Sequence, residues 1–295
     1  MRDFIFRGDY SRAAFEDRCS GSADAAEPAP ALTAPGVDCA AISTPAIPHI
    51  VHQTWKSADL PPRFAKWRQA WRTLHPQWDH RFYDDADIRR VIADRAPRWL
   101  SVHDRLPRAI QRVDLFRYLI VYLDGGLYAD LDMEPHLPSD SLVADASCVF
   151  CVEFHLGARR QKELGYRLPW QIANCIFAAA PGHEFFAEIL DEIGRRASNP
   201  VIKDADVEDI TGPRMLTRLA FALTREQRGA VRILPQINWM APREYPRIGP
   251  LARLVHASHA TAGTWRTARI PRLWYNSLTW SHLRGSVSAI APELP

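Results

Sequence analysis

The 295-residue sequence predicts an α/β fold with a mostly parallel central sheet and helices on both faces. Three observations lead to this prediction. The first half of the chain repeats an apolar, β-prone segment followed by an amphipathic helix, which is typical of parallel strands joined by helical crossovers. A helix that is apolar on nearly all sides precedes Gly125 and Gly126, so it should be buried. A short strand follows these glycines and ends in two acids, Asp130 and Asp132.

The first expected strand covers residues 47–53, and Trp55 follows shortly after it. Trp55 would then lie at the carboxyl end of a strand, where ligands gather in open α/β sheets. Pro61 and Pro62 suit the first turn of an amphipathic helix that should end at His75. We expect the aromatic side chains of this helix to lie in the core.

A second strand is expected over residues 80–83. Asp84 follows it, and Asp84 with Asp87 is placed to cap the next helix. Capping is the interpretation that we favour over substrate contact. A third repetition of strand and helix should then lead through Trp99 towards the buried helix.

The buried helix should begin at Pro107 and end at Gly125. It carries two charged residues, Asp114 and Arg117, which are three positions apart and therefore share one face. Charged groups in a core must be paired with each other or with another polar group. The simplest interpretation is an ion pair between these two side chains.

Asp130 and Asp132 alternate with Leu131 at the end of the short strand. In an extended chain both carboxylates would point to one side, while Leu131 would point to the core. Two acids that face the same way repel each other unless a cation lies between them. Mg²⁺ and Mn²⁺ prefer oxygen ligands and often complete their coordination with phosphates. A pair of acids in a solvated turn is the alternative, because Asp-x-Asp alone is a weak signal.

The order of these groups resembles the DXD-containing sugar transferases of glycosyltransferase family 32. That family includes inositol-phosphoceramide mannosyltransferases, α-1,6-mannosyltransferases and α-1,4-galactosyltransferases. The resemblance extends over about residues 47–265 and implies a GT-A-like domain at 46–266. The segments that carry it most clearly are DLFRY (114–118) and GGLYADLD (125–132).

The resemblance implies that Asp114, Arg117 and Asp132 are catalytic residues. Asp114 and Arg117 would contact the sugar and phosphate of a nucleoside-diphosphate sugar donor, for which the forked guanidinium is suited. Trp55 would lie near the nucleotide base, with a core position as the alternative. The donor-binding residues implied in this way are Trp55, Asp114, Arg117, Tyr128, Asp130 and Asn174.

The resemblance also implies a metal site, in which Asp130, Asp132 and a late histidine or serine bind Mn²⁺ or Mg²⁺. A last strand is expected over residues 254–256, and His259 follows it. His259 is the ligand that we expect, and His256 is the alternative. An imidazole ligand suits Mn²⁺ better than Mg²⁺.

The middle of the chain supplies two further expected strands, at 148–154 and 172–179. Asn174 interrupts the second, and a buried amide needs partners. The phrase from Asn174 through Phe177 to Pro181-Gly182-His183 resembles a motif of the family, in which an amide lies near the transferred sugar. The basic segment at 156–169 is interpreted as a surface loop, in preference to a lid.

Two helix starts are expected in the second half. His183 should begin one of them. Thr211 and Gly212 precede Pro213, which suits the first position of a helix whose free amides could face an anion. We favour pure capping over ligand binding for this segment.

Composition limits the alternatives. The composition is ordinary for a soluble globular protein, with a net charge of +3, 47% hydrophobic residues and 24% charged residues. The sequence has no basic run that would indicate nucleic acid as a partner. No apolar run approaches the ~20 residues of a membrane helix, so we expect no transmembrane segment and a cytoplasmic protein, compatible with peripheral membrane contact. Five cysteines fit free thiols; Cys148 and Cys151 should face opposite sides of a strand as core residues.

The terminal segments are interpreted by composition. Residues 1–45 are rich in Ala, Pro, Ser and Gly and should be disordered. Residues 267–295 form a C-terminal extension whose aromatic residues could stack on an acceptor sugar, namely Trp274, Tyr275 and Trp280.

The resemblance thus leads to one main hypothesis of function. We expect a metal-dependent, retaining glycosyltransferase that moves a hexose from a nucleoside-diphosphate sugar to a hydroxyl of a glycan or glycolipid. Two other hypotheses remain open. One is a sugar-phosphate phosphohydrolase with Asp130 as nucleophile and Asp132 as acid. The other is a non-catalytic carbohydrate-binding protein, motivated by the ten tryptophans.

Overall fold

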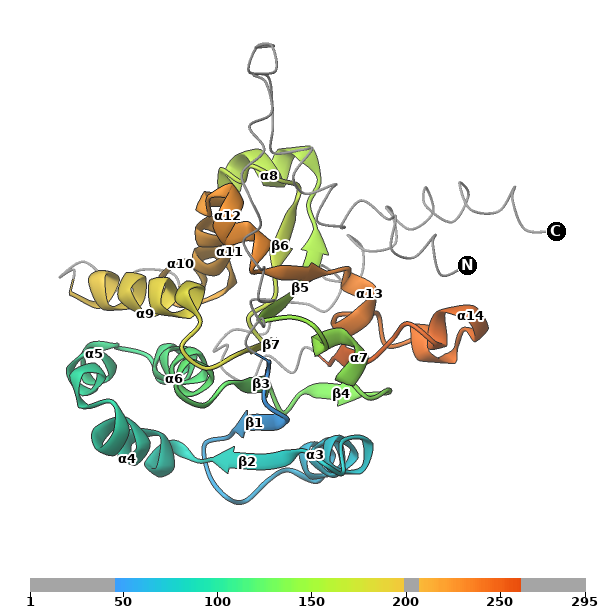
Figure 1. Ribbon diagram of the computed structural model, residues 1–295, viewed down its shortest axis with the longest axis horizontal. Helices are drawn as coiled ribbons and strands as arrows, with labels where there is room; N and C mark the ends of the chain where they lie inside the picture. Colours follow the sequence, from blue (N-terminus) through green and yellow to red (C-terminus); the bar gives the residue numbers. More distant parts are fainter. Residues whose placement is uncertain (1–45, 199–206, 261–295) are drawn as a thin grey trace, which may run out of the picture.

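The computed structural model describes residues 46–198 and 207–260. At its centre is a seven-stranded sheet with the order β2-β1-β3-β7-β5-β6, in which β8 also pairs with β5 (Figure 1). The strands are β1 (Ile50–Thr54), β2 (Asp79–Tyr83), β3 (Gly126–Ala129), β5 (Cys148–His155), β6 (Trp170–Ile172), β7 (Ile176–Ala179) and β8 (Arg232–Leu234).

Most of the sheet runs in one direction. Strand β1 is parallel to β2 and β3, and β8 is parallel to β5. Strand β7 is antiparallel to β3 and β5, and β6 is antiparallel to β5. Strands β1, β2, β3, β5 and β8 therefore share one direction, and β6 and β7 oppose it. The predicted α/β class with a mostly parallel sheet is confirmed.

Helices cover both faces of the sheet, as predicted. Side chains alternate along β3, so Tyr128 joins one apolar cluster and Leu127 joins the other. Figure 1 shows α4, α5, α6 and α9 together on one side of the sheet. That face is covered by α4 (Asp85–Arg95), α5 (Leu100–Arg105), α6 (Ala109–Asp124), α9 (Glu184–Ala197) and α11 (Pro213–Ala222). The other is covered by α3 (Pro62–Leu74), α7 (Asp140–Val143) and α13 (Gln236–Trp239).

A small second sheet lies beside the end of β3. It pairs β4 (Met133–Pro135) with β9 (Ala257–His259) in antiparallel register, and Met133 lies opposite His259. The remaining elements are η1 (Pro97–Trp99), α8 (Ala158–Leu164), α10 (Val207–Ile210), α12 (Arg225–Gly229), η3 (Tyr245–Arg247) and α14 (Gly249–Ala252).

Several local predictions are confirmed. Asp84 caps α4, and Asp87 completes a capping box with it. His183 caps α9 through its ring nitrogen. Cys148 and Cys151 are buried on opposite faces of the sheet.

Within the two described ranges, no helix is long and apolar enough to cross a membrane.

Some boundaries in the first half differ from the prediction. The segment through Trp99 is helical and contributes no strand, because η1 and α5 fill the interval before α6. Helix α6 begins at Ala109, so Pro107 lies before it. Leu106 is extended, with ψ of 120°, which is the conformation that a following proline favours. Strand β1 begins at Ile50, three residues later than predicted.

The second half also differs in three places. The basic segment at 156–169 contains helix α8. The apolar run at 172–179 forms two strands, and Asn174 lies in the bend between them. The last strand covers Ala257–His259, and the predicted strand at 254–256 is wrong. The terminal segments 1–45 and 267–295, with Trp274, Tyr275 and Trp280, lie outside the described residues.

Candidate active site at the carboxyl edge of the sheet

Two glycines bring β3 against β1. Gly125 and Gly126 have φ of 66° and 97°, a region that L side chains rarely adopt. A Cβ atom on Gly126 would lie 2.7 Å from the carbonyl oxygen of Ile50. The glycines therefore permit both the sharp exit from α6 and the close approach of the two strands. Strand β3 then ends at the same edge of the sheet as β1.

The acid pair lies in a turn. The backbone N–H of Met133 donates to the carbonyl oxygen of Asp130 at 3.0 Å, so the chain reverses over these four residues. The predicted strand-like alternation of Asp130, Leu131 and Asp132 is therefore wrong. Leu131 is nevertheless buried, as predicted, and packs with Phe64.

Asp130 is held by three partners. Its backbone N–H donates to the carbonyl oxygen of Cys175 at 2.8 Å. Its Oδ1 accepts from the hydroxyl of Tyr128 at 2.8 Å and lies 3.2 Å from Nη2 of Arg117. Burial raises the pKa of the Asp130 carboxyl, and the nearby Arg117 opposes that shift.

The predicted ion pair on α6 is confirmed. Nη2 of Arg117 lies 3.3 Å from Oδ1 of Asp114, and the two side chains are 3% and 2% exposed. Asp114 also accepts from Thr211 at 2.7 Å and from the Asn174 amide at 3.3 Å. Burial raises the pKa of Asp114 to about 6, although Arg117 and both donors oppose it. The Arg117 guanidinium thus connects Asp114 to the acid pair.

Arg117 also fixes the segment before β7. Its Nη1 donates to the carbonyl oxygen of Asn174 at 2.8 Å. Asn174 therefore contacts both members of the pair, its carbonyl on Arg117 and its side chain on Asp114. The structure brings three of the predicted donor-binding residues together at one point. Within residues 46–198 and 207–260, the Nε atom of Arg117 is buried and has no hydrogen-bond partner.

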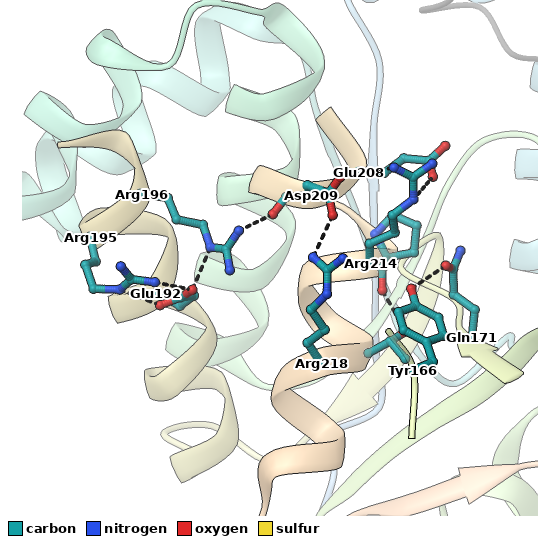
Figure 2. A network of polar contacts seen from close by, with 11 residues as sticks. Tyr166, Gln171, Glu192, Arg195, Arg196, Glu208, Asp209, Arg214 and Arg218 are labelled. Carbon is teal, nitrogen blue, oxygen red and sulfur yellow. Dashed lines mark hydrogen bonds and ion pairs between the residues drawn. The ribbon is translucent and has the colours of Figure 1, made fainter. Parts of the chain in front are cut away.

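Thr211 is a site residue that sequence reasoning missed. Capping was the favoured role of the Thr-Gly-Pro segment, yet the Thr211 hydroxyl donates to Asp114, 97 positions away. Figure 2 shows the ion pairs beside this segment: Arg214 pairs with Glu208 at 3.0 Å, and Arg218 pairs with Asp209 at 2.6 Å. These contacts join α10 to α11 on either side of Thr211. No short-range signal could have indicated the bond.

Tyr128 holds the Asp130 carboxylate through a hydrogen bond. The Tyr128 side chain is fully buried, and the Arg117 guanidinium lies 5.0 Å above its ring. Its hydroxyl donates to Asp130, so the Thr54 hydroxyl must be the donor in the 2.8 Å contact between Thr54 and Tyr128. Tyr128 thus positions the Asp130 carboxylate, and its direct contact with a donor stays a prediction.

His259 joins the acid pair, and His256 does not. Nε2 of His259 lies 3.2 Å from Oδ1 of Asp132, because the pairing of β4 with β9 places the two residues side by side. His256 instead donates from Nδ1 to the carbonyl oxygen of Pro138 at 2.6 Å. Burial lowers the pKa of His259, but the nearby carboxylates, Asp132 foremost, together raise it, so the net shift is upward.

The side-chain atoms of the acid pair and His259 suit a hard divalent cation, but the three side chains do not converge on one point. Asp132 and His259 are adjacent, and Nδ1 of His259 is buried with no hydrogen-bond partner in the described chain. Asp130 is turned towards Arg117 and Tyr128. Across the described ranges, no group of three or more His, Cys, Asp or Glu side chains is arranged to hold a metal ion. Carboxylate and imidazole donors fit Mn²⁺ chemically, and Asp130 would have to exchange partners.

Trp55 lies beside the acid pair. It follows β1, and its ring packs edge-on against Phe64, with 4.8 Å between ring centroids. Both rings pack in the small cluster that contains Leu131. The indole Nε1 of Trp55 and the amide Nε2 of Gln53 are buried without partners in the described chain. Gln53, which the sequence reasoning did not select, therefore adds a second unused donor at this strand end.

The fold and the site together resemble one class of protein. An α/β sheet that presents an acid pair at its carboxyl edge, backed by a buried Asp114–Arg117 ion pair, resembles the glycosyltransferase domains of the DXD type. Residues 61–149 match the family model described as "Glycosyltransferase sugar-binding region containing DXD motif". Over these residues the match confirms the resemblance that the sequence pattern predicted.

Two curated relatives are named for the mannosylation of an inositol-containing ceramide. Inositol phosphoceramide mannosyltransferase 3 of Schizosaccharomyces pombe is 31% identical over 172 residues, which are 58% of this chain and 44% of that protein. Mannosyl phosphorylinositol ceramide synthase SUR1 of Saccharomyces cerevisiae is 28% identical over 191 residues, or 64% of this chain and 46% of that protein. The chain spans about half the length of these relatives.

A solved structure is similar at lower identity. The ligand-free glycosyltransferase domain of the YGT toxin is 10% identical, with a TM-score of 0.44, over 64% of this chain and 80% of that chain.

Proposed function

We propose that this protein is a metal-dependent, retaining hexosyltransferase. It would move a hexose, with mannose as the first candidate, from a nucleoside-diphosphate sugar to a hydroxyl of a glycan or glycolipid. The relatives are named for inositol phosphoceramide and mannosyl phosphorylinositol ceramide, which makes an inositol-containing glycolipid the first acceptor to test. The observation that carries the proposal is the Arg117 guanidinium, which contacts Asp114 and Asp130 together.

The Asp114–Arg117 pair suits a donor sugar. Arg117 offers a fixed fork of donors and remains charged, so it can bind phosphate or sugar oxygens without changing its protonation state. Asp114 accepts hydrogen bonds, and Thr211 and Asn174 hold its two oxygens in place. Preorganised groups of this kind cost no reorientation during the reaction.

Asp130, Asp132 and His259 are the residues that would hold Mn²⁺ or Mg²⁺. A bound cation supplies positive charge to the diphosphate as the glycosidic bond breaks. The chain itself supplies the rigid frame, because Tyr128 and Thr54 fix Asp130 from one side. Trp55, beside the acid pair, is the candidate surface for the nucleotide base.

Retention is part of the same proposal. Within the proposed mechanism the acceptor hydroxyl attacks from the face that the diphosphate leaves. The bond between the acceptor oxygen and the anomeric carbon forms as the bond to the diphosphate oxygen breaks. The proton of the hydroxyl passes to the departing diphosphate.

A direct test combines binding and turnover. The purified chain would be screened by thermal shift against GDP-mannose, UDP-galactose and UDP-glucose, with and without Mn²⁺, because a ligand that binds the folded state raises the melting temperature. Transfer to a short-chain inositol phosphoceramide would be followed by mass spectrometry. We expect one nucleotide sugar to stabilise the protein only with Mn²⁺ and to serve as donor.

The matched variants are Asp132→Asn and Asp94→Asn, the latter on the exposed face of α4. Asp132→Asn should abolish the Mn²⁺-dependent shift and the transfer while circular dichroism stays unchanged. Asp94→Asn should behave as wild type. Transfer that persists in excess EDTA contradicts the metal dependence. Release of inorganic phosphate from sugar phosphates would indicate a phosphohydrolase instead.

A further inference from the structure

Glu153 lies one strand beyond the donor site along the same edge of the sheet. Following the strand order β1-β3-β7-β5, the edge presents Trp55 after β1, Asp130 after β3 and Asn174 before β7. Strand β7 is antiparallel to its neighbours, so its first residues lie at this edge. Glu153 follows in the carboxyl half of β5. If the donor runs from its base near Trp55 to its sugar near Asn174, Glu153 lies past the sugar.

An irregularity in the sheet sets the direction of this side chain. Strand β5 pairs with β6 through Val152 opposite Ile172 and Phe154 opposite Gln171, and the register shifts between these pairs at Glu153. Such bulges re-aim a side chain and are frequent next to active sites. Gln171, the hydrogen-bond partner of Glu153, lies three residues before Asn174 in the chain, so this bond keeps Glu153 close to the segment that contacts Asp114 and Arg117.

A buried amide holds the Glu153 carboxylate. The Nε2 of Gln171 donates to Oε2 of Glu153 at 2.8 Å, and Gln171 is 2% exposed. The carbonyl oxygen of the same amide accepts from the Tyr166 hydroxyl at 2.7 Å (Figure 2). Because Tyr166 occupies the carbonyl end, the amide presents its N–H to Glu153. This contact favours the ionised carboxylate, which is an acceptor only.

We propose that Glu153 forms an acceptor subsite and accepts hydrogen bonds from adjacent hydroxyls of a sugar or cyclitol ring. The inference rests on the proposed function and adds the residue that recognises the acceptor. Glu153 takes no part in the bond changes at the anomeric carbon, and it orients the ring whose neighbouring hydroxyl attacks. Gln171 is a positioning residue, because it acts through Glu153.

The test separates acceptor binding from donor chemistry. Transfer from the nucleotide sugar that stabilises the wild type would be measured with Mn²⁺ and with methyl α-mannoside or myo-inositol as the varied acceptor. These two probes distinguish a sugar from a cyclitol ring. Glu153→Gln should raise the acceptor KM ~10- to 100-fold, the range for a hydrogen bond to a charged group. The melting-temperature shift with donor and the rate of donor hydrolysis by water should stay within about twofold of wild type.

Three further variants sharpen the result. Glu163→Gln makes the same change on the solvent-exposed face of α8 and should leave the acceptor KM unchanged. Glu153→Asp keeps the charge on a shorter side chain and should give an intermediate KM. Gln171→Leu should raise the acceptor KM less than Glu153→Gln, without changing donor hydrolysis.

Each outcome supports or contradicts the acceptor subsite at Glu153. An unchanged acceptor KM in Glu153→Gln overturns the inference. Loss of the donor-induced rise in melting temperature in Glu153→Gln, while Glu163→Gln keeps it, also overturns the inference. Slower donor hydrolysis at unchanged acceptor KM would assign Glu153 to the reaction itself and contradict the subsite. If no nucleotide sugar stabilises the wild type and no sugar is transferred, the proposed function fails first, and the subsite falls with it.

Discussion

Arg117 of α6 forms an ion pair with Asp130 at the end of β3, with 3.2 Å between Nη2 and Oδ1. The same nitrogen lies 3.3 Å from Asp114. One buried cation therefore lies between two carboxylates that come from different elements. The position of the acid pair depends on helix α6 as well as on its own strand.

Arg117→Met should destabilise the protein strongly. It leaves two carboxylates, Asp114 and Asp130, without their shared cation, and breaking a buried ion pair in this way typically costs about 3–5 kcal/mol of unfolding free energy. Arg117→Lys should cost less, because it keeps the charge and loses only the fork. Urea unfolding measures both. Arg90→Met removes an exposed pair with Asp87 and should change the unfolding free energy little.

Thr211→Val should weaken the support of Asp114. Valine has a similar shape but no hydroxyl, so a buried carboxylate oxygen loses its 2.7 Å donor. The cost should be about 1–3 kcal/mol of unfolding free energy. The pKa of Asp114 should rise, because the Thr211 bond now lowers it.

The control for this change is Thr73→Val on α3, whose exposed hydroxyl bonds only to the Gln69 carbonyl oxygen of its own helix. We expect its unfolding free energy to match wild type. If Thr211→Val unfolds no more easily than Thr73→Val, the contact with Asp114 contributes nothing.

Three glycine substitutions should form a graded series. Gly126→Ala combines a φ of 97° with a clash at 2.7 Å against Ile50, so we expect little folded protein. Gly182→Ala has a φ of 71° but no atom within 4 Å, and should cost only the backbone strain of about 1–2 kcal/mol. Gly157→Ala has an ordinary φ of −68° and open space, and should be neutral. Soluble yield and melting temperature give the order, and equal values for Gly126→Ala and Gly157→Ala contradict it.

Short-range sequence patterns were sufficient to predict most of the helices and strands. The apolar run of α6, the Gly125–Gly126 stop and the Asp84 cap are all short-range signals, and the structure confirms them. The Asp114–Arg117 pair was predictable because residues three apart on a helix share a face. The family resemblance followed from this segment.

Contacts between distant segments were not predictable in the same way. The Thr211–Asp114 and Gln171–Glu153 bonds depend on how helices and strands pack, and no spacing in the sequence encodes them. The alternation rule failed at Asp130, because the chain turns there instead of extending. The cation remains a prediction from chemistry and resemblance.

His52 gives the protein a pH-dependent stability with a definite sign. The ring is fully buried in β1; Nε2 donates to the Gly125 carbonyl oxygen at 2.9 Å, and Nδ1 lies 3.2 Å from the Tyr83 hydroxyl. Burial lowers the pKa of His52 to about 4 from its ordinary 6.5. The hydrogen bond to Gly125 opposes this shift, and the charge of Arg81 adds to it. The folded state therefore binds this proton more weakly than the unfolded chain.

The contribution of His52 is fully present above pH 6.5, where both states are neutral. As the pH falls towards 4, the unfolded chain takes up the proton first, and stability is lost. The difference between the two pKa values corresponds to about 3 kcal/mol of unfolding free energy. His52→Gln keeps an N–H donor for Gly125 and cannot titrate. The difference in unfolding free energy between wild type and His52→Gln should therefore shrink by about this amount between pH 7 and pH 4. A difference that stays constant over this range would show that His52 titrates alike in both states.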